Sequence, residues 1–223
     1  MIIAAVGLER ERRIVDGPGV EAIAGGGDKL RLEALLDERA AKAHGIISIG
    51  IAGGLAPALC PGDWILADSV DGTPTDAAWT GRLAARLPDA TRGPLIGADA
   101  IVASSTEKAE LHRATGALAV DMESHVAARV AQRHRLPFAA ARVVCDPAHR
   151  TLPPAARVAM KPDGRVDFLA VMRSLLAHPA QLPALIQTGR DAEQAFESLL
   201  RGQRRLGPGL CGLDLSQLGV DVA

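Results

Sequence analysis

Two carboxylate side chains follow apolar segments of the chain, and their positions suit acid chemistry on a small molecule. Glu123 ends the run Val120-Asp121-Met122-Glu123, where an apolar strand is expected to give way to a helix. Asp146 ends the run Arg142-Val143-Val144-Cys145-Asp146, 23 residues further along, after the next apolar strand. Ligands of open α/β sheets bind beyond the carboxyl ends of the strands. We therefore expect one carboxylate to hold hydroxyl groups and the other to deliver a proton.

Each of these side chains also has an ordinary structural interpretation, and the residues alone leave both open. Asp146 precedes Pro147, and this dipeptide commonly starts a turn. To act as an acid, Asp146 must be partly desolvated or bonded to the substrate, because a free aspartate is ionised at neutral pH. Glu123 would stabilise the first turn of a helix, or accept hydrogen bonds from two vicinal hydroxyls such as those of ribose. Met122 offers a polarizable surface to a flat base, or packs in the core.

Three further segments contain small or charged residues that suit ligand binding. The run 50–54, which includes Ala52 and Gly53, follows a buried strand, and its small residues allow a ligand to approach the backbone. The run 25–27, with Gly26 at its centre, precedes a helix and forms either an anion-binding turn or a plain connection. Neither run matches a phosphate-loop or dinucleotide pattern. Glu11 lies in a charged run after the first strand, where it activates water or simply starts a solvated helix.

Composition argues against several classes of protein. The net charge is −1 and aromatic residues make up 2% of the chain, so a basic nucleic-acid surface and base-stacking platforms are not expected. No apolar stretch reaches the roughly 20 residues that span a bilayer. The three cysteines and six histidines show no metal-ligand spacing. Reduced thiols and the lack of a recognisable leader predict a cytoplasmic protein without a bound metal.

Apolar segments alternate with segments of helical composition along the chain. We expect strands at 2–6, 45–50, 64–68, 95–104, 117–120 and 138–144, and helices at 30–42, 123–135, 166–176, 181–187 and 191–204. This alternation predicts one α/β domain with a twisted, mixed but mostly parallel sheet and helices on both faces. The domain is expected to cover residues 1–205, and residues 206–223 are expected to form a C-terminal tail.

Four segments, taken together, resemble the nucleoside phosphorylase and nucleosidase superfamily, and they occur in the family order. They are Gly7-Leu8-Glu9-Arg10-Glu11, Gly50-Ile51-Ala52-Gly53-Gly54 with Pro61-Gly62-Asp63, Val120-Asp121-Met122-Glu123, and Arg142-Val143-Val144-Cys145-Asp146. The run Thr115-Gly116-Ala117 and residues 146–167 extend the likeness toward the hopanoid-associated phosphorylases. The resemblance implies a three-layer sandwich of the nucleoside phosphorylase type.

The resemblance also implies a role for each candidate residue. Asp146 is similar to the acid that protonates N7 of a purine, and Glu123 to the acceptor of the ribose hydroxyls, with Met122 against the sugar or base. Glu11 resembles the carboxylate that orients water in hydrolytic members. The remaining positions implied are Cys145 and Ile101 beside the base, and Ala52, Gly53 and Gly26 on the side of the sugar and of the phosphate or water. Two positions depart from the family pattern: Arg12 aligns with an acidic position, and Ile51 stands where many relatives carry a hydroxyl.

The activity implied by this resemblance is cleavage of the N-glycosidic bond of a purine nucleoside. The hopanoid-associated members imply adenine release from adenosylhopane, by phosphorolysis or by hydrolysis. No cofactor is implied, and inorganic phosphate is the co-substrate of the phosphorolytic alternative. A methylthioadenosine or S-adenosylhomocysteine nucleosidase and a non-catalytic nucleoside-binding module remain alternatives. The family likeness further implies a homo-oligomer, such as a dimer, with peripheral contact to the inner membrane face if the substrate is lipid-linked.

Overall fold

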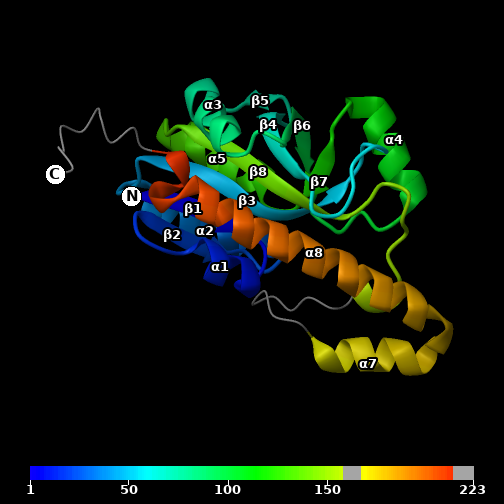
Figure 1. Cartoon of the computed structure of the whole chain (residues 1–223). Helices are drawn as coiled ribbons and strands as arrows, with labels where there is room; N and C mark the ends of the chain where they lie inside the picture. The colour runs from blue at the N-terminus through cyan, green and yellow to red at the C-terminus, as the bar shows by residue number, and fades with distance from the viewer. Residues whose placement is uncertain (158–166, 213–223) are drawn as a thin grey trace.

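Strands and helices alternate in the computed structural model, which describes residues 1–157 and 167–212 (Figure 1). The strands are β1 Ile2–Val6, β2 Val20–Ala24, β3 Gly45–Gly54, β4 Trp64–Val70, β5 Thr73–Pro74, β6 Thr91–Gly97, β7 Ala119–Asp121 and β8 Phe138–Asp146. The helices are α1 Glu9–Val15, α2 Lys29–Ala40, α3 Ala77–Arg86, α4 Ser105–Thr115, α5 Ser124–His134, α6 Pro154–Arg157, α7 Phe168–Ala177 and α8 Leu182–Leu206, with 3₁₀ turns η1 Pro179–Gln181 and η2 Pro208–Cys211.

The strands form one mixed sheet, part of which closes on itself. β3 pairs with β8, β8 with β4, β4 with β6, β6 with β7, and β7 returns to β3. β1 and β2 extend the sheet from β3, and β5 adds to β4. Among the described strands, five pairings are parallel and three are antiparallel, which confirms the predicted mixed, mostly parallel sheet.

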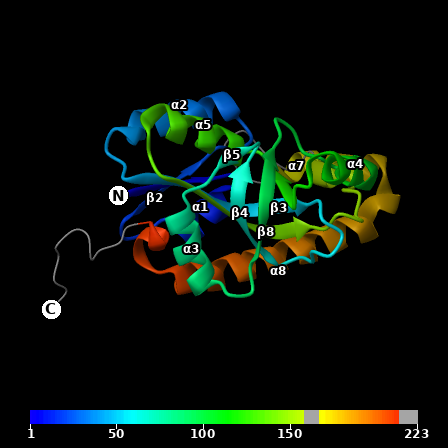
Figure 2. The same ribbon diagram turned by 90° about the horizontal axis from the view of Figure 1, so that it is seen from above.

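Helices cover both faces of the sheet because each turns an apolar stripe toward it. Figure 2 shows α2 and α5 on one side of the sheet and α3 and α8 on the other. Leu36 of α2 and Val130 of α5 are fully buried in one core cluster. Trp79 of α3 and Leu199 of α8 are fully buried in the other. This arrangement confirms the predicted α/β sandwich.

The predicted strand at 95–104 is wrong in its second half. β6 ends at Gly97, which pairs with Asp121, the last residue of β7. The Ala98 N–H still donates to the Asp121 carbonyl at 2.8 Å, and the chain then leaves the sheet as a loop that ends where α4 begins. The sequence interpretation also missed β2, α3 and α4, and it divided α8 into two helices.

Residues 206–212 pack on the domain, although they were predicted to begin a tail. Leu206 and Leu210 are buried. The Trp79 indole Nε1 donates to the Leu210 carbonyl at 2.8 Å, and the Arg82 Nε donates to the Cys211 carbonyl at 2.8 Å. The predicted boundary after residue 205 is therefore too early. The rest of the predicted tail, 213–223, lies outside the described residues.

None of the described helices is by itself long and apolar enough to cross a bilayer. Leu169–Ala177 and Pro179–Leu206 together meet the length and composition test, but the pair is bent by 113°.

Candidate active site

Glu11 and Glu123, which lie far apart in the sequence, come together at the end of β1. The closeness of the two carboxylates is seen at Gly7, the residue that follows β1. A Cβ atom at Gly7 would lie 2.8 Å from Oε1 of Glu123 and 3.3 Å from Oε2 of Glu11. The absence of a side chain at Gly7 therefore allows both carboxylates to approach the same short stretch of backbone.

Asp146 lies beside the end of β3, where Gly53 is its register partner. A Cβ atom at Gly53 would lie 3.9 Å from Oδ2 of Asp146 and 3.5 Å from Val120 Cγ1, in the strand that leads to Glu123. The pairing of β3 with β8 is irregular between Ala52 and Gly53. The ends of β3, β7 and β8 therefore bring together several of the predicted site residues.

Glu11 is almost completely buried and binds three backbone N–H groups. Its Oε2 accepts from Gly7 at 2.7 Å and from Leu8 at 2.6 Å, and its Oε1 accepts from Ile51 at 2.7 Å. Burial raises the pKa of Glu11, and the positive charge of Arg142 together with these N–H groups opposes the rise. The carboxylate thus fastens the end of β1 to β3, and its predicted role toward water stays a prediction.

Glu123 belongs to a buried network centred on Arg142. Arg142 has no exposed surface, and its guanidinium lies 3.1 Å from Oδ2 of Asp121 and 3.4 Å from Oε2 of Glu123. Asp121 is held in turn by the N–H groups of Glu123 and Ser124, at 2.8 and 2.6 Å. The guanidinium also donates to the hydroxyl of Ser48. Arg142 therefore holds the Glu123 carboxylate directly, while Asp121 and Ser48 hold the guanidinium of Arg142 in place.

Burial raises the pKa of Glu123 to about 8. The positive charge of Arg142 opposes this rise, while the negative charges of Asp121 and Glu11 add to it. Hydrogen-bond donors from a ligand would stabilise the ionised form of Glu123. The predicted role of Glu123 as an acceptor of ligand hydroxyl groups stays a prediction.

Asp146 is buried, and its two carboxylate oxygens have different surroundings. Oδ2 forms an ion pair with the ammonium group of Lys108, which is itself fully buried. Oδ1 has no hydrogen-bond partner among the described residues. Burial raises the pKa of Asp146, and the positive charges of Lys108 and Arg150 oppose the rise. A buried oxygen without a partner, on an acid with a raised pKa, is a candidate for proton transfer to a ligand.

The other predicted contact residues lie on several strands and loops, and their contacts with a ligand stay predictions. Met122 and Cys145 are half-buried, and burial raises the pKa of the Cys145 thiol to about 12, so it remains neutral. Ile101 is 36% exposed in the loop between β6 and α4. Ala52 is buried near the end of β3. The N–H of Gly26 donates to the carbonyl of Gly7 at 2.9 Å, so this donor already has a partner.

Lys108 and Arg142 are the site residues whose roles the sequence interpretation missed. Arg142 was noted only as part of a motif, although an arginine inside a continuous apolar strand signals a buried ion pair. Lys108 lies 38 residues before Asp146 in a helix that was not predicted. Within the described residues, no group of three or more His, Cys, Asp or Glu side chains could hold a metal ion.

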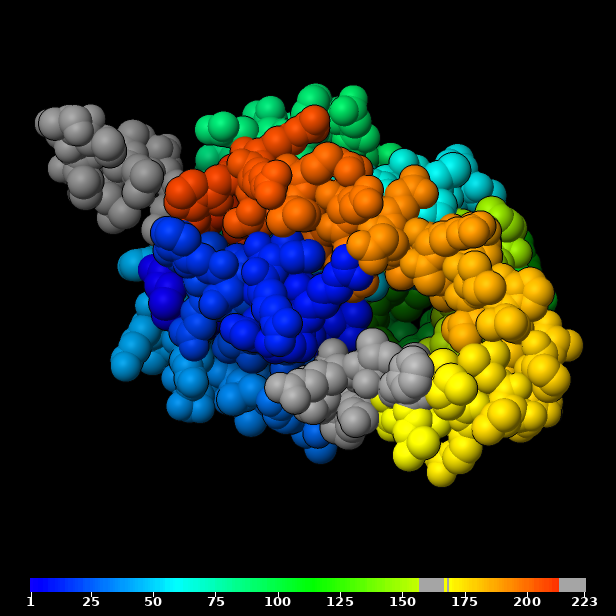
Figure 3. Space-filling model, turned by 60° about the horizontal axis from the view of Figure 1, so that its bottom comes forward, coloured from blue at the N-terminus to red at the C-terminus, as the bar shows by residue number. Residues whose placement is uncertain are grey.

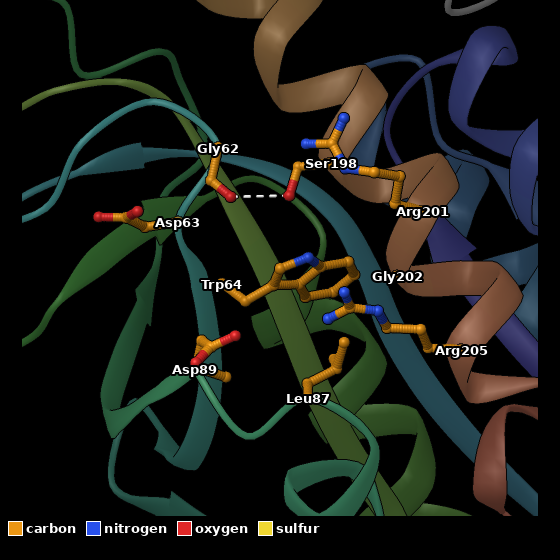
Figure 4. Close-up of a pocket in the computed structure, with 10 residues that line it drawn as sticks. Gly62, Asp63, Trp64, Leu87, Asp89, Ser198, Arg201, Gly202 and Arg205 are labelled. Atoms are coloured by element: carbon orange, nitrogen blue, oxygen red, sulfur yellow. Dashed lines mark hydrogen bonds between the residues drawn. The ribbon is translucent and has the colours of Figure 1, made fainter.

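The surface of the described chain has two concave regions. Figure 3 shows a hollow bordered by α7, α8 and the N-terminal part of the chain, with green atoms from the middle of the chain at its floor. A separate cavity, with a volume of about 210 Å³, lies between the start of β4 and α8. Figure 4 shows its lining residues. Trp64, Ser198 and Arg205 are among its lining residues, and Ser198 donates to the Gly62 carbonyl at 2.7 Å. None of the predicted site residues lines this second cavity.

The model of the phosphorylase superfamily matches residues 29–177, more than half of the chain, and the chain belongs to that family. This membership makes the protein a nucleoside-cleaving enzyme. The comparison with curated protein sequences gave no match.

Solved structures with the same fold include several nucleosidases. The 5′-methylthioadenosine/S-adenosylhomocysteine nucleosidase of Helicobacter pylori is 15% identical, with a TM-score of 0.65 over 92% of this chain and 95% of that chain. The S-adenosylhomocysteine nucleosidase of Streptococcus pyogenes is 19% identical, with a TM-score of 0.57 over 85% and 95%. A futalosine hydrolase mutant of Helicobacter pylori is 16% identical, with a TM-score of 0.55 over 64% and 88%. At these identities the likeness is one of fold.

Proposed function

We propose that this enzyme cleaves the N-glycosidic bond of a purine nucleoside, with Asp146 as the acid that protonates the base. The observation that carries this proposal is the asymmetry of the Asp146 carboxyl group. Its Oδ2 is held by Lys108, whereas its buried Oδ1 has no partner among the described residues. A carboxyl group in this state has one oxygen available to a ring nitrogen of a base.

The other carboxylates support the same chemistry at the sugar. Glu123, fixed by Arg142, accepts hydrogen bonds from the ribose hydroxyls. These hydroxyl donors stabilise the ionised form of Glu123, whose negative charge then lies near the positive charge that develops on the sugar as the bond breaks. The nucleophile, which is water or inorganic phosphate, then attacks the sugar on the face opposite the departing base. Glu11 orients the water in the hydrolytic case. Proton donation of this kind typically contributes about 10²–10⁴-fold to the rate.

We further propose that the substrate carries a large apolar group at its 5′ position, as adenosylhopane does. Support comes from exposed apolar side chains on the two helices that border the hollow in Figure 3. Leu169, Met172 and Leu176 of α7 are 71%, 40% and 80% exposed, and Leu182 and Ile186 of α8 are 48% and 49% exposed. The alternative is a small 5′-thio substituent, as in methylthioadenosine, and the nucleosidase fold supports it equally. The predicted dimer and the predicted membrane contact stay predictions.

Product analysis with two substrates tests this proposal. Purified enzyme is incubated with a short-chain adenosylhopane mimic and with methylthioadenosine, each with and without inorganic phosphate. Free adenine and the sugar product are then measured by chromatography and mass spectrometry. We expect adenine from the apolar substrate at a higher kcat/KM, since the exposed apolar residues contact its chain.

The sugar product identifies the nucleophile, because a sugar 1-phosphate requires phosphate and a free sugar requires water. Faster cleavage of methylthioadenosine would reject the apolar substrate and favour the small-substituent alternative. If neither compound released adenine, and no other purine nucleoside released its free base, the proposed reaction would be rejected.

A further inference from the structure

We infer that Lys108 is a positioning residue for the proton donor: it holds one oxygen of the Asp146 carboxyl group and so leaves the other facing the base. This inference rests on the proposed function. It adds a residue that lies outside every motif by which the sequence was interpreted.

The hydrogen-bonding capacity of the Lys108 ammonium group is fully used. An ammonium group has three donors. Besides Oδ2 of Asp146, its nearest oxygens are the carbonyls of Arg150 at 3.1 Å and Pro147 at 3.2 Å, with the Asp146 carbonyl at 3.5 Å. The ammonium group therefore binds the strand end and the segment that follows it, and it has no free donor for a ligand.

The helix that carries Lys108 is fixed to that same segment. Lys108 lies in the first turn of α4. The Ser105 N–H donates to the hydroxyl of Thr151 at 3.1 Å, and the Leu152 N–H donates to the Ala103 carbonyl at 2.9 Å. Because α4 and residues 146–152 are joined at several points, Lys108 cannot shift without moving the acid. Because Lys108 holds Oδ2 of Asp146, these contacts also limit the rotation of the Asp146 carboxyl group.

Two other charged groups near Asp146 affect its pKa in opposite directions. Arg150 and Asp191 act on Asp146 with opposite sign, and they form an ion pair with each other at 3.0 Å. Cys145, the neighbour on β8, carries a neutral thiol. Among these groups, Lys108 is the fully buried charge in direct contact with the acid.

The charge of Lys108 also matters for the strength of the acid. Burial raises the pKa of Asp146, and Lys108 is the largest influence that lowers it. A general acid works best when its pKa is near the operating pH. Without Lys108, burial would act with less opposition, so Asp146 would hold its proton to higher pH and release it less readily.

Replacing Lys108 with methionine tests this inference, with Lys108→Arg as the variant that keeps the charge. We expect Lys108→Met to lower kcat by up to about 10²-fold, as a misplaced catalytic group does, with little change in KM. The alkaline limb of the pH profile should move to higher pH, because activity is lost as Asp146 ionises. Lys108→Arg should return that limb toward its wild-type position. Lys42→Met, at an exposed lysine that follows α2, is the control and should change neither quantity.

A carboxyl NMR titration of Asp146 in wild type and Lys108→Met provides a readout that does not depend on catalysis. We expect Asp146 to titrate at higher pH in the variant. An unchanged titration and an unmoved alkaline limb would reject the inference, and would leave Lys108 with a purely structural role. If Lys108→Met does not fold, Lys108→Gln replaces it, because glutamine keeps donors for the two carbonyl groups without the charge. If the wild-type enzyme cleaves no purine nucleoside, the proposed function fails. The titration would still test whether Lys108 controls the ionisation of Asp146.

Discussion

Replacing Asp146 with asparagine is expected to reduce adenine release by about 10²–10⁴-fold. Asparagine keeps the size and shape of the side chain but has no acidic proton to give to the base. The variant should still bind a purine nucleoside, since Glu123 and its Arg142 anchor are unchanged. Steady-state assays of adenine release and calorimetric titration with an uncleaved nucleoside analogue would measure the two effects separately.

The matched control for this change is Asp68→Asn. Asp68 is exposed and forms a surface ion pair with Arg92 at 2.7 Å. This variant should release adenine at the wild-type rate. If Asp146→Asn retained activity within a few-fold of wild type, the assignment of Asp146 as the acid would be wrong.

Replacing Arg142 with methionine is expected to lower the free energy of unfolding by about 3–5 kcal/mol. Arg142 is fully buried, and its removal leaves Asp121 and Glu123 buried without their cation. The lost positive charge would also raise the pKa of Glu123 further, which weakens it as an acceptor of ribose hydroxyls. Urea unfolding followed by circular dichroism would give the change in stability.

Arg92→Met is the comparison for this prediction, because Arg92 pairs with Asp68 at the surface. Exposed ion pairs typically contribute about 0–1 kcal/mol. A loss at Arg142 no larger than the loss at Arg92 would show that the buried network does not stabilise the fold as argued.

The sequence was sufficient to find the two strand ends that carry Glu123 and Asp146. Both residues follow apolar segments, which predict the strands that precede them. The structure pairs β3 in parallel with β8 but antiparallel with β7, so these two strand ends are not the carboxyl ends of parallel neighbours. The positions of β3, β7 and β8 followed from apolar composition to within a few residues. These parts of the fold depend on local patterns, which a single sequence displays.

The partners of the carboxylates could not be predicted, because they depend on how distant elements meet. Lys108 reaches Asp146 only after α4 has packed beside the end of β8, and no local spacing relates the two residues. The apolar residues after Gly97 have strand composition and predict a longer strand, whereas β6 ends where its neighbour β7 ends. For α3, Asp76 is a local signal of a helix start, because its side chain accepts from the Trp79 N–H.

The most direct test of proton donation to the base is a comparison between an adenine nucleoside and its 7-deaza counterpart. The two differ at one ring position, where carbon replaces the nitrogen that would accept the proton from Asp146. The mechanism predicts that wild-type enzyme releases adenine from the first compound and binds the second as an uncleaved competitive inhibitor. Cleavage of the 7-deaza compound at a comparable kcat would contradict it.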